Sequence, residues 1–85
     1  MKHAGPAALD ALDELLVKLR TRPTLKERSR GVFYLKSSAF LHFHEDPAGF
    51  FADLKVGGDF VRFRVSTAKE RAALLRELDR ALKSA

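Results

Sequence analysis

The spacing of apolar residues changes twice along this chain, and this change constrains the fold more than any other feature. Over residues 7–20 leucines recur every three or four positions, the spacing of one helix face. Those residues are Leu9, Leu12, Leu16 and Leu19. From Gly31 to Val65 the period falls to two, which is typical of strands, and helical spacing returns over residues 67–83. The sequence therefore predicts a helix, a sheet and a second helix.

Four segments between Gly31 and Val65 are rich in aromatic and β-branched residues, as strands are. They read GVFYLK, AFLHFH, FFADLKV and DFVRFRV. Turn signals separate them: Ser37-Ser38, the stretch DPAG, and Gly57-Gly58, which favours a tight two-residue hairpin. We expect four antiparallel strands in a meander over residues 31–65.

Local signals place the ends of the two helices. Pro6 suits a first helical turn, and the helix over 7–20 should end before Pro23. Thr67 and Glu70 have the spacing of a capping box. Residues 21–30 form a basic connector, either a solvated linker or one short helical turn.

This order of elements predicts the fold class. The 85 residues make a single domain, 1–85, because so short a chain has room for one core. Two amphipathic helices and one sheet favour an α+β two-layer sandwich, helix–meander–helix, with both helices on one sheet face.

Alternation sorts the strand residues onto two faces. The apolar face should meet the helices and takes Phe33, Leu35, Leu41, Phe43, Ala52, Leu54, Val56, Val61, Phe63 and Val65. The other face, called the open face below, takes Tyr34, Phe40, His42, His44, Phe51, Asp53, Lys55, Phe60, Arg62 and Arg64. Hairpin registers then place Asp53 opposite both His42 and Arg62, and Phe40 opposite Lys55. We expect a cross-strand row of His42, Asp53 and Arg62, whose side chains can touch.

The stretch HFH invites a metal or catalytic interpretation. His42 and His44 share a face, and Asp53 or Glu45 could add a ligand, but a site needs three or four ligands. No cysteine is present, and His3 lies in a terminus expected to be frayed. The sequence therefore predicts no metal and no cofactor, with His42, His44 and Asp53 the candidates if one binds. His42 with Asp53 could also form an acid–base pair, but no positioned nucleophile accompanies it. An ordinary charge row is the simpler structural interpretation.

The open face favours binding over catalysis. Aromatics interleaved with Lys55, Arg62 and Arg64 are typical of a nucleic-acid stacking platform, although Asp53 lies at the centre of this one. Self-association or a protein partner would bury the same aromatics. We therefore expect a non-enzymatic domain that forms a homodimer or binds a protein partner, with nucleic acid as the alternative.

Charge and hydropathy bound the remaining classes. The net charge of +5 comes from the two flanking segments, because residues 31–65 carry four basic and four acidic side chains. Without a recognition motif this charge is weak support for nucleic-acid binding. No apolar run is long enough to span a membrane, and the first residues lack the apolar core of a signal peptide. We expect a soluble cytoplasmic protein.

The segment GVFYLKSSAFLHFHEDPAGFFADLK resembles a group of short uncharacterised bacterial α+β proteins that share an FLHFH-ED-P…ADL pattern. It is also faintly similar to the luciferase-type small domain, which carries HxH followed by a D-L strand. His42, His44, Asp53 and Leu54 are the matching positions, within about 25 residues of the chain. The resemblance implies an α+β domain and assigns no biochemistry. The order of elements is also similar to part of the MmcQ/YjbR-type fold, as a likeness of shape alone.

Overall fold

A computed structural model describes all residues from 1 to 85. The chain forms three helices and six strands in one antiparallel sheet, arranged as follows. In chain order the elements are β1 (Lys2–His3), α1 (Pro6–Ala11), α2 (Asp13–Leu19), β2 (Leu25–Ser29), β3 (Val32–Leu35), β4 (Ser38–Asp46), β5 (Gly49–Val56), β6 (Asp59–Arg64) and α3 (Ala68–Ser84). The main sheet order is β2-β3-β4-β5-β6, and β1 adds to β4. The expected α+β class with an antiparallel sheet is confirmed.

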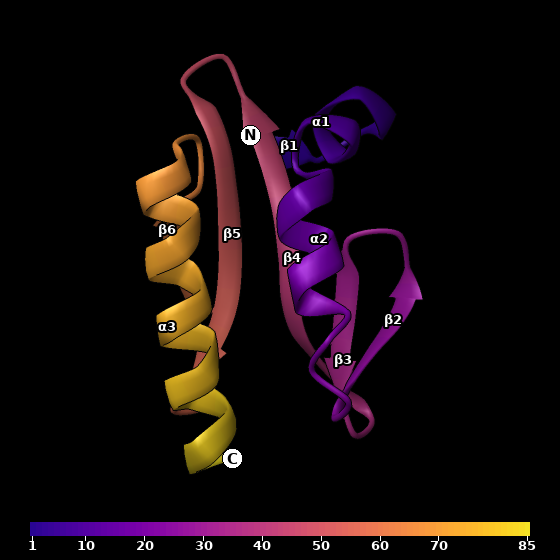
Figure 1. The fold of residues 1–85 in the computed structure, drawn as a ribbon, viewed down its shortest axis with the longest axis vertical. Coiled ribbons are helices and arrows are strands. Elements are labelled where there is room, and N and C mark those ends of the chain that lie inside the picture. The colour runs from indigo at the N-terminus through magenta and orange to yellow at the C-terminus, as the bar shows by residue number, and fades with distance from the viewer.

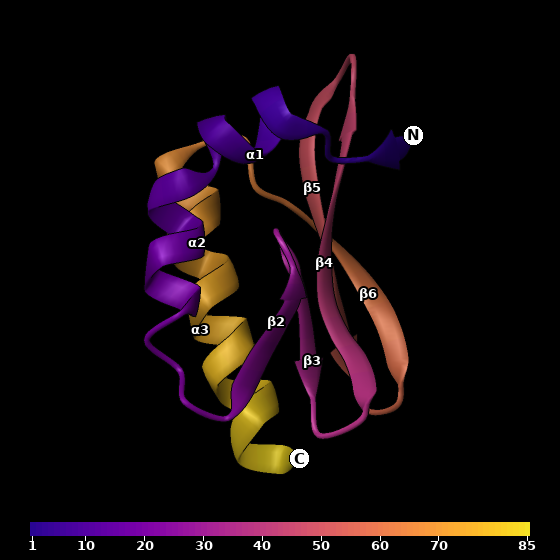
Figure 2. The same cartoon turned by 90° about the vertical axis from the view of Figure 1, so that its right-hand side faces the viewer.

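Helices α2 and α3 lie side by side on one face of the sheet, while α1 crosses the end of the sheet and connects to β1 (Figures 1 and 2). The other face carries no helix (Figure 2). The leucines of the first helical segment are buried, as the spacing predicts. They pack with Phe33, Leu41, Phe43 and Leu54 from the sheet and with Leu74 and Leu78 from α3. The core therefore fills the space between one sheet face and two helices.

The registers of the β4–β5 and β5–β6 hairpins are those expected around His42, Asp53 and Arg62. Gly57 and Gly58 turn with positive φ, and β6 then returns with Asp53 opposite Arg62. In the preceding hairpin His42 lies opposite Asp53 and His44 opposite Phe51. The glycine turn and the alternation of strand residues are enough to fix this part of the sheet.

The expected count of four strands is wrong, because two further strands form. Residues 25–29 of the basic connector pair with β3 as β2, so the connector is neither a linker nor a helical turn. Leu25 packs against the core, and Glu27 accepts hydrogen bonds from Arg20 and from the Gly31 backbone N–H at 2.9 Å. The pairing with β3 and these contacts outweigh the charged composition of the segment.

The single helix expected over residues 7–20 is two helices that meet at Leu12. Leu12 has φ of −95° and ψ of 9°, outside the helical range, although its N–H still bonds to the carbonyl of Ala8 at 3.1 Å. The resulting change of direction lets α1 cross the sheet end while α2 lies along its face (Figure 2). Leu12 remains fully buried at the bend.

Phe40 does not lie on the open face, where alternation places it. The pairing of β3 with β4 shifts between Phe33↔Leu41 and Tyr34↔Ala39, so Phe40 is the extra residue of a β-bulge. A bulge interrupts the alternation of side chains. Phe40 therefore joins Leu41 in the core, only 4% exposed, and the pair Phe40–Lys55 does not form.

Two residues assigned to the apolar face are left exposed. Val56 borders the Gly57-Gly58 turn and Val61 lies on the edge strand β6. Their exposed fractions are 39% and 40%. Facing the helix side is therefore not sufficient for burial at the margin of so small a sheet.

Candidate functional site

Strand β1 brings a third histidine to the open face. His3 pairs with His44, and Lys2 pairs with Glu45. Strand β1 therefore pairs with the same edge of β4 as β3 does, beyond the end of β3. The Ala4 N–H donates to the Phe43 carbonyl at 3.0 Å, and the Gly5 N–H donates to Glu45 Oε2 at 2.7 Å. The expectation that His3 lies in a frayed terminus is wrong, because these bonds hold the segment against β4.

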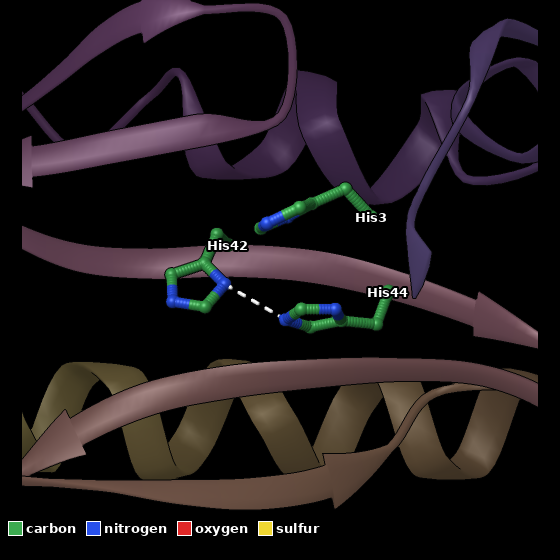
Figure 3. Close-up of side chains that lie close together, drawn as sticks. All are labelled: His3, His42 and His44. Carbon is green, nitrogen blue, oxygen red and sulfur yellow. Dashed lines mark hydrogen bonds between the residues drawn. The ribbon is translucent and has the colours of Figure 1, made fainter. Parts of the chain in front are cut away.

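The three histidines form one cluster, drawn in Figure 3. One ring nitrogen of each can be chosen so that all three lie within 4.8 Å of one another. His42 Nδ1 is 3.1 Å from His44 Nε2, and the His3 ring stacks on the His44 ring with centroids 4.7 Å apart. His42 and His44 are half-buried and His3 is exposed. The ring nitrogens of the cluster therefore lie close to one another, and the cluster is open to solvent on the side of His3.

Asp53 lies beside the cluster and is only 8% exposed. Its carboxylate accepts two hydrogen bonds from the Arg62 guanidinium, at 2.8 and 2.9 Å. Asp53 Oδ2 also lies 3.2 Å from His44 Nε2. The expected row of His42, Asp53 and Arg62 therefore forms with a change of partner, because His44 on the diagonal and not His42 contacts the carboxylate.

Burial and neighbouring charge shift two pKa values in this cluster. The two Arg62 hydrogen bonds lower the pKa of Asp53, although burial acts in the opposite direction. Burial lowers the pKa of His42, although the Asp53 charge opposes this shift. Asp53 is therefore ionised and His42 is neutral near pH 7.

Replacing Arg62 by glutamine is expected to raise the pKa of Asp53. The Arg62 hydrogen bond is the largest cause that lowers this pKa, and the opposing effect of burial remains in the variant. In the wild type the pKa of Asp53 is below 3.8, so its contribution to stability is present above that pH and is lost as pH falls through the folded-state pKa. The variant should lose this contribution.

An NMR titration of the Asp53 carboxyl carbon measures this shift directly. Arg64→Gln is the matched control, since the Arg64 side chain lies on the same strand and is also 48% exposed. Unchanged Asp53 titration in Arg62→Gln would contradict the assigned cause.

The remaining aromatics of the open face are each covered by a cation. Arg28 lies 4.7 Å from the Tyr34 ring centroid, Lys55 lies 5.3 Å from that of Phe60, and Arg64 lies 5.5 Å from that of Phe51. Cation–π contacts of this kind account for aromatic rings on a face that no helix covers.

Nine of the ten residues assigned to the open face are therefore compatible with that placement, with Phe40 the exception. Sequence reasoning missed His3 and Arg28 as members of this face. His3 carries no local signal, because a strand of two residues has no period and forms only through contacts with β4. Arg28 lies on β2, which the sequence does not predict.

One groove on the surface lies away from the histidines. It has a volume of about 640 Å³ and opens between the β3–β4 turn, the β5–β6 turn and the C-terminal part of α3. Its apolar lining comes from Leu35, Phe40, Val56, Ala81 and Ala85. The histidine cluster is therefore a surface site and not the floor of a deep pocket.

The chain matches no protein-family model, no curated protein and no solved structure. The resemblance to short bacterial α+β proteins and to the luciferase-type domain therefore stays a prediction. None of the three helices has the length and the apolar composition needed to cross a membrane.

Proposed function

We propose that this domain acts as a homodimer in which two copies of β6 pair and join the two sheets into one. The observation that carries this proposal is the exposure of apolar side chains on both faces of this edge strand. Phe60 on the open face is 44% exposed and Val61 on the helix side is 40% exposed. An edge strand also has unpaired backbone N–H and C=O groups, which favour pairing with another strand.

The opposite edge of the sheet has the features of an edge that avoids pairing. Strand β2 carries Lys26, Glu27 and Arg28 in succession, and a register shift interrupts its pairing with β3. Charges and bulges are two of the devices that protect sheet edges. The pairing of β6 with β5 is regular over all six residues, so no bulge protects this edge of the sheet.

A two-fold axis through Val61, perpendicular to the sheet, gives a register that keeps both faces matched. Val61 then lies opposite Val61 of the second copy, and Phe60 lies opposite Arg62 of the second copy. Antiparallel pairing about this axis is isologous, as in most homodimers, and Phe60 with Arg62 is a favourable cation–π pair. Centring the axis on Arg62 would instead place two like charges opposite each other.

Val61→Lys is expected to weaken dimerisation by at least about tenfold, because a charge would then meet its own copy across the seam. Sedimentation equilibrium over a range of concentrations measures the effect. Val17→Lys is the matched control, since Val17 is 51% exposed on α2, far from β6, and should leave the dimer unchanged. A wild type that stays monomeric at every concentration would contradict the proposal.

The proposed register allows a sharper measurement. The chain has no cysteine, so a single Val61→Cys variant can form only a symmetric disulfide between two copies. Opposed side chains in antiparallel strands have Cβ atoms about 4.5–5.5 Å apart, close to the range that a disulfide spans. Mild oxidation should therefore give a covalent dimer with Val61→Cys and little with Val17→Cys. Equal crosslinking of both variants would point to random collision.

The nucleic-acid alternative predicts a different response. Tyr34, Phe51 and Phe60 each already have a cation against the ring, so a stacking base would compete with that cation or use the other ring face. Binding of a single-stranded oligonucleotide that weakens steeply with salt would support nucleic acid instead.

A further inference from the structure

We propose that His3, His42 and His44 bind one divalent transition-metal ion, with zinc as the expected ion. This site is separate from the β6 seam, and neither proposal depends on the other. The ligands come from two segments that are far apart in the chain, the two-residue strand β1 and the middle of β4.

The positions of the ring nitrogens support this site. Zinc binds histidine nitrogens at about 2.0–2.1 Å, so two nitrogens on a tetrahedral ion lie about 3.3 Å apart. His42 Nδ1 and His44 Nε2 are 3.1 Å apart, close to this spacing. Figure 3 shows the His3 ring next to the other two rings, with its centroid 5.9 Å from that of His42 and 4.7 Å from that of His44. All three ligand atoms lie within 4.8 Å of one another, so the widest pair has to close by at most about 1.5 Å. The His3 ring, which stacks on the His44 ring, also has to turn so that a nitrogen faces the ion.

His44 Nε2 has two close neighbours, His42 Nδ1 at 3.1 Å and Asp53 Oδ2 at 3.2 Å, and carries at most one proton. That proton can be donated to either neighbour. An ion at the same place would instead use the lone pairs of His44 Nε2 and His42 Nδ1 together, and it would lie beside the Asp53 carboxylate.

The surroundings suit a divalent cation bound by nitrogen. Asp53 places a carboxylate next to His44, and Arg62 fixes that carboxylate in position through two hydrogen bonds. This carboxylate contacts the nitrogen that would bind the ion, so its negative charge lies beside the ion and favours a bound cation. Imidazole ligands favour zinc, copper and nickel over magnesium and calcium. Three histidines on zinc leave a fourth position for water, as in catalytic zinc sites.

Zinc titration by calorimetry, with cobalt as an optical probe, tests this site. We expect one ion per chain and the visible absorption of tetrahedral cobalt. His3→Ala should weaken zinc binding by at least about tenfold, since it removes one of three ligands. Lys2→Ala is the matched control, because Lys2 is the neighbouring residue of β1 and points to the opposite side of the strand. It should bind zinc as the wild type does.

Four further variants separate ligand loss from misfolding and from the dimer. His42→Asn and His44→Asn should abolish the cobalt spectrum while the far-ultraviolet circular dichroism keeps its shape. Asp53→Asn should weaken zinc binding by about tenfold without abolishing it, because it removes a negative charge beside the ion. Val61→Lys should bind zinc normally, so loss of the dimer and loss of the metal are distinguishable.

The overturning results are equally specific. Absence of zinc binding to the folded wild type overturns the site. Zinc binding that is equal in the wild type and in His3→Ala overturns the three-histidine assignment.

Discussion

Phe33→Ala is expected to lower the free energy of unfolding by about 3–5 kcal/mol, the usual cost of truncating a buried phenylalanine. Phe33 is 1% exposed and lies on β3, where it contributes to the core between the sheet and the helices. A domain of this size is stable by roughly 5–10 kcal/mol, so the variant should be close to unfolding at 25 °C. Urea denaturation followed by circular dichroism measures the loss.

Phe33→Leu is the matched control for this prediction. It removes the aromatic ring but keeps an apolar side chain that fills part of the volume, so the loss should be clearly smaller than for alanine. The two variants should also unfold with similar slopes against urea, because the surface exposed on unfolding is nearly the same. Equal stability of Phe33→Ala and the wild type would mean that Phe33 does not lie in the core.

Gly49→Ala is expected to have the second largest effect, about 2–4 kcal/mol of lost stability, from backbone strain and a lost hydrogen bond. Gly49 has φ of +134°, far from the left-handed region that other residues can reach. A Cβ at this position would collide with Ser66 Oγ and lie 3.2 Å from the Arg64 guanidinium. Ser66 Oγ accepts a hydrogen bond from the Phe50 N–H at 2.9 Å, which the collision would break.

Gly57→Ala tests whether this loss comes from the surroundings or from positive φ alone. Gly57 also has positive φ, +61°, but a Cβ there would have no atom within 4 Å. Its cost should therefore be about 1 kcal/mol, the strain of a left-handed alanine. Thermal unfolding of both variants gives the comparison. A Gly57→Ala variant as unstable as Gly49→Ala would contradict the role assigned to Ser66.

The substitutions at Phe33 and Gly49 also concern the histidine cluster, because both residues help to position β4 and β5. Phe33 lies opposite Leu41 of β4, one residue before His42. Gly49 joins β4 to β5, and β5 carries Asp53. If zinc binds at the site proposed above, zinc added to either variant should recover part of the lost stability, because a ligand that binds only the folded chain stabilises it by mass action.

The sequence by itself determined the regular part of this protein. Alternation and the Gly57-Gly58 turn place Asp53 opposite His42 and Arg62, because a period of two and a two-residue turn leave one register that buries the apolar side chains. The leucine spacing and the capping box of Thr67 with Glu70 likewise determined the helix faces and the start of α3.

Only the tertiary structure decided the features that depend on contacts between distant residues. Phe40 enters the core because a bulge interrupts alternation, and β2 forms where Leu25 packs against that core. His3 joins His42 and His44 because Ala4 and Gly5 bond to β4, about forty residues away along the chain. Periodicity reports only which face a residue prefers within one element, so the meeting of three histidines from two elements was decided by the packing of the whole chain.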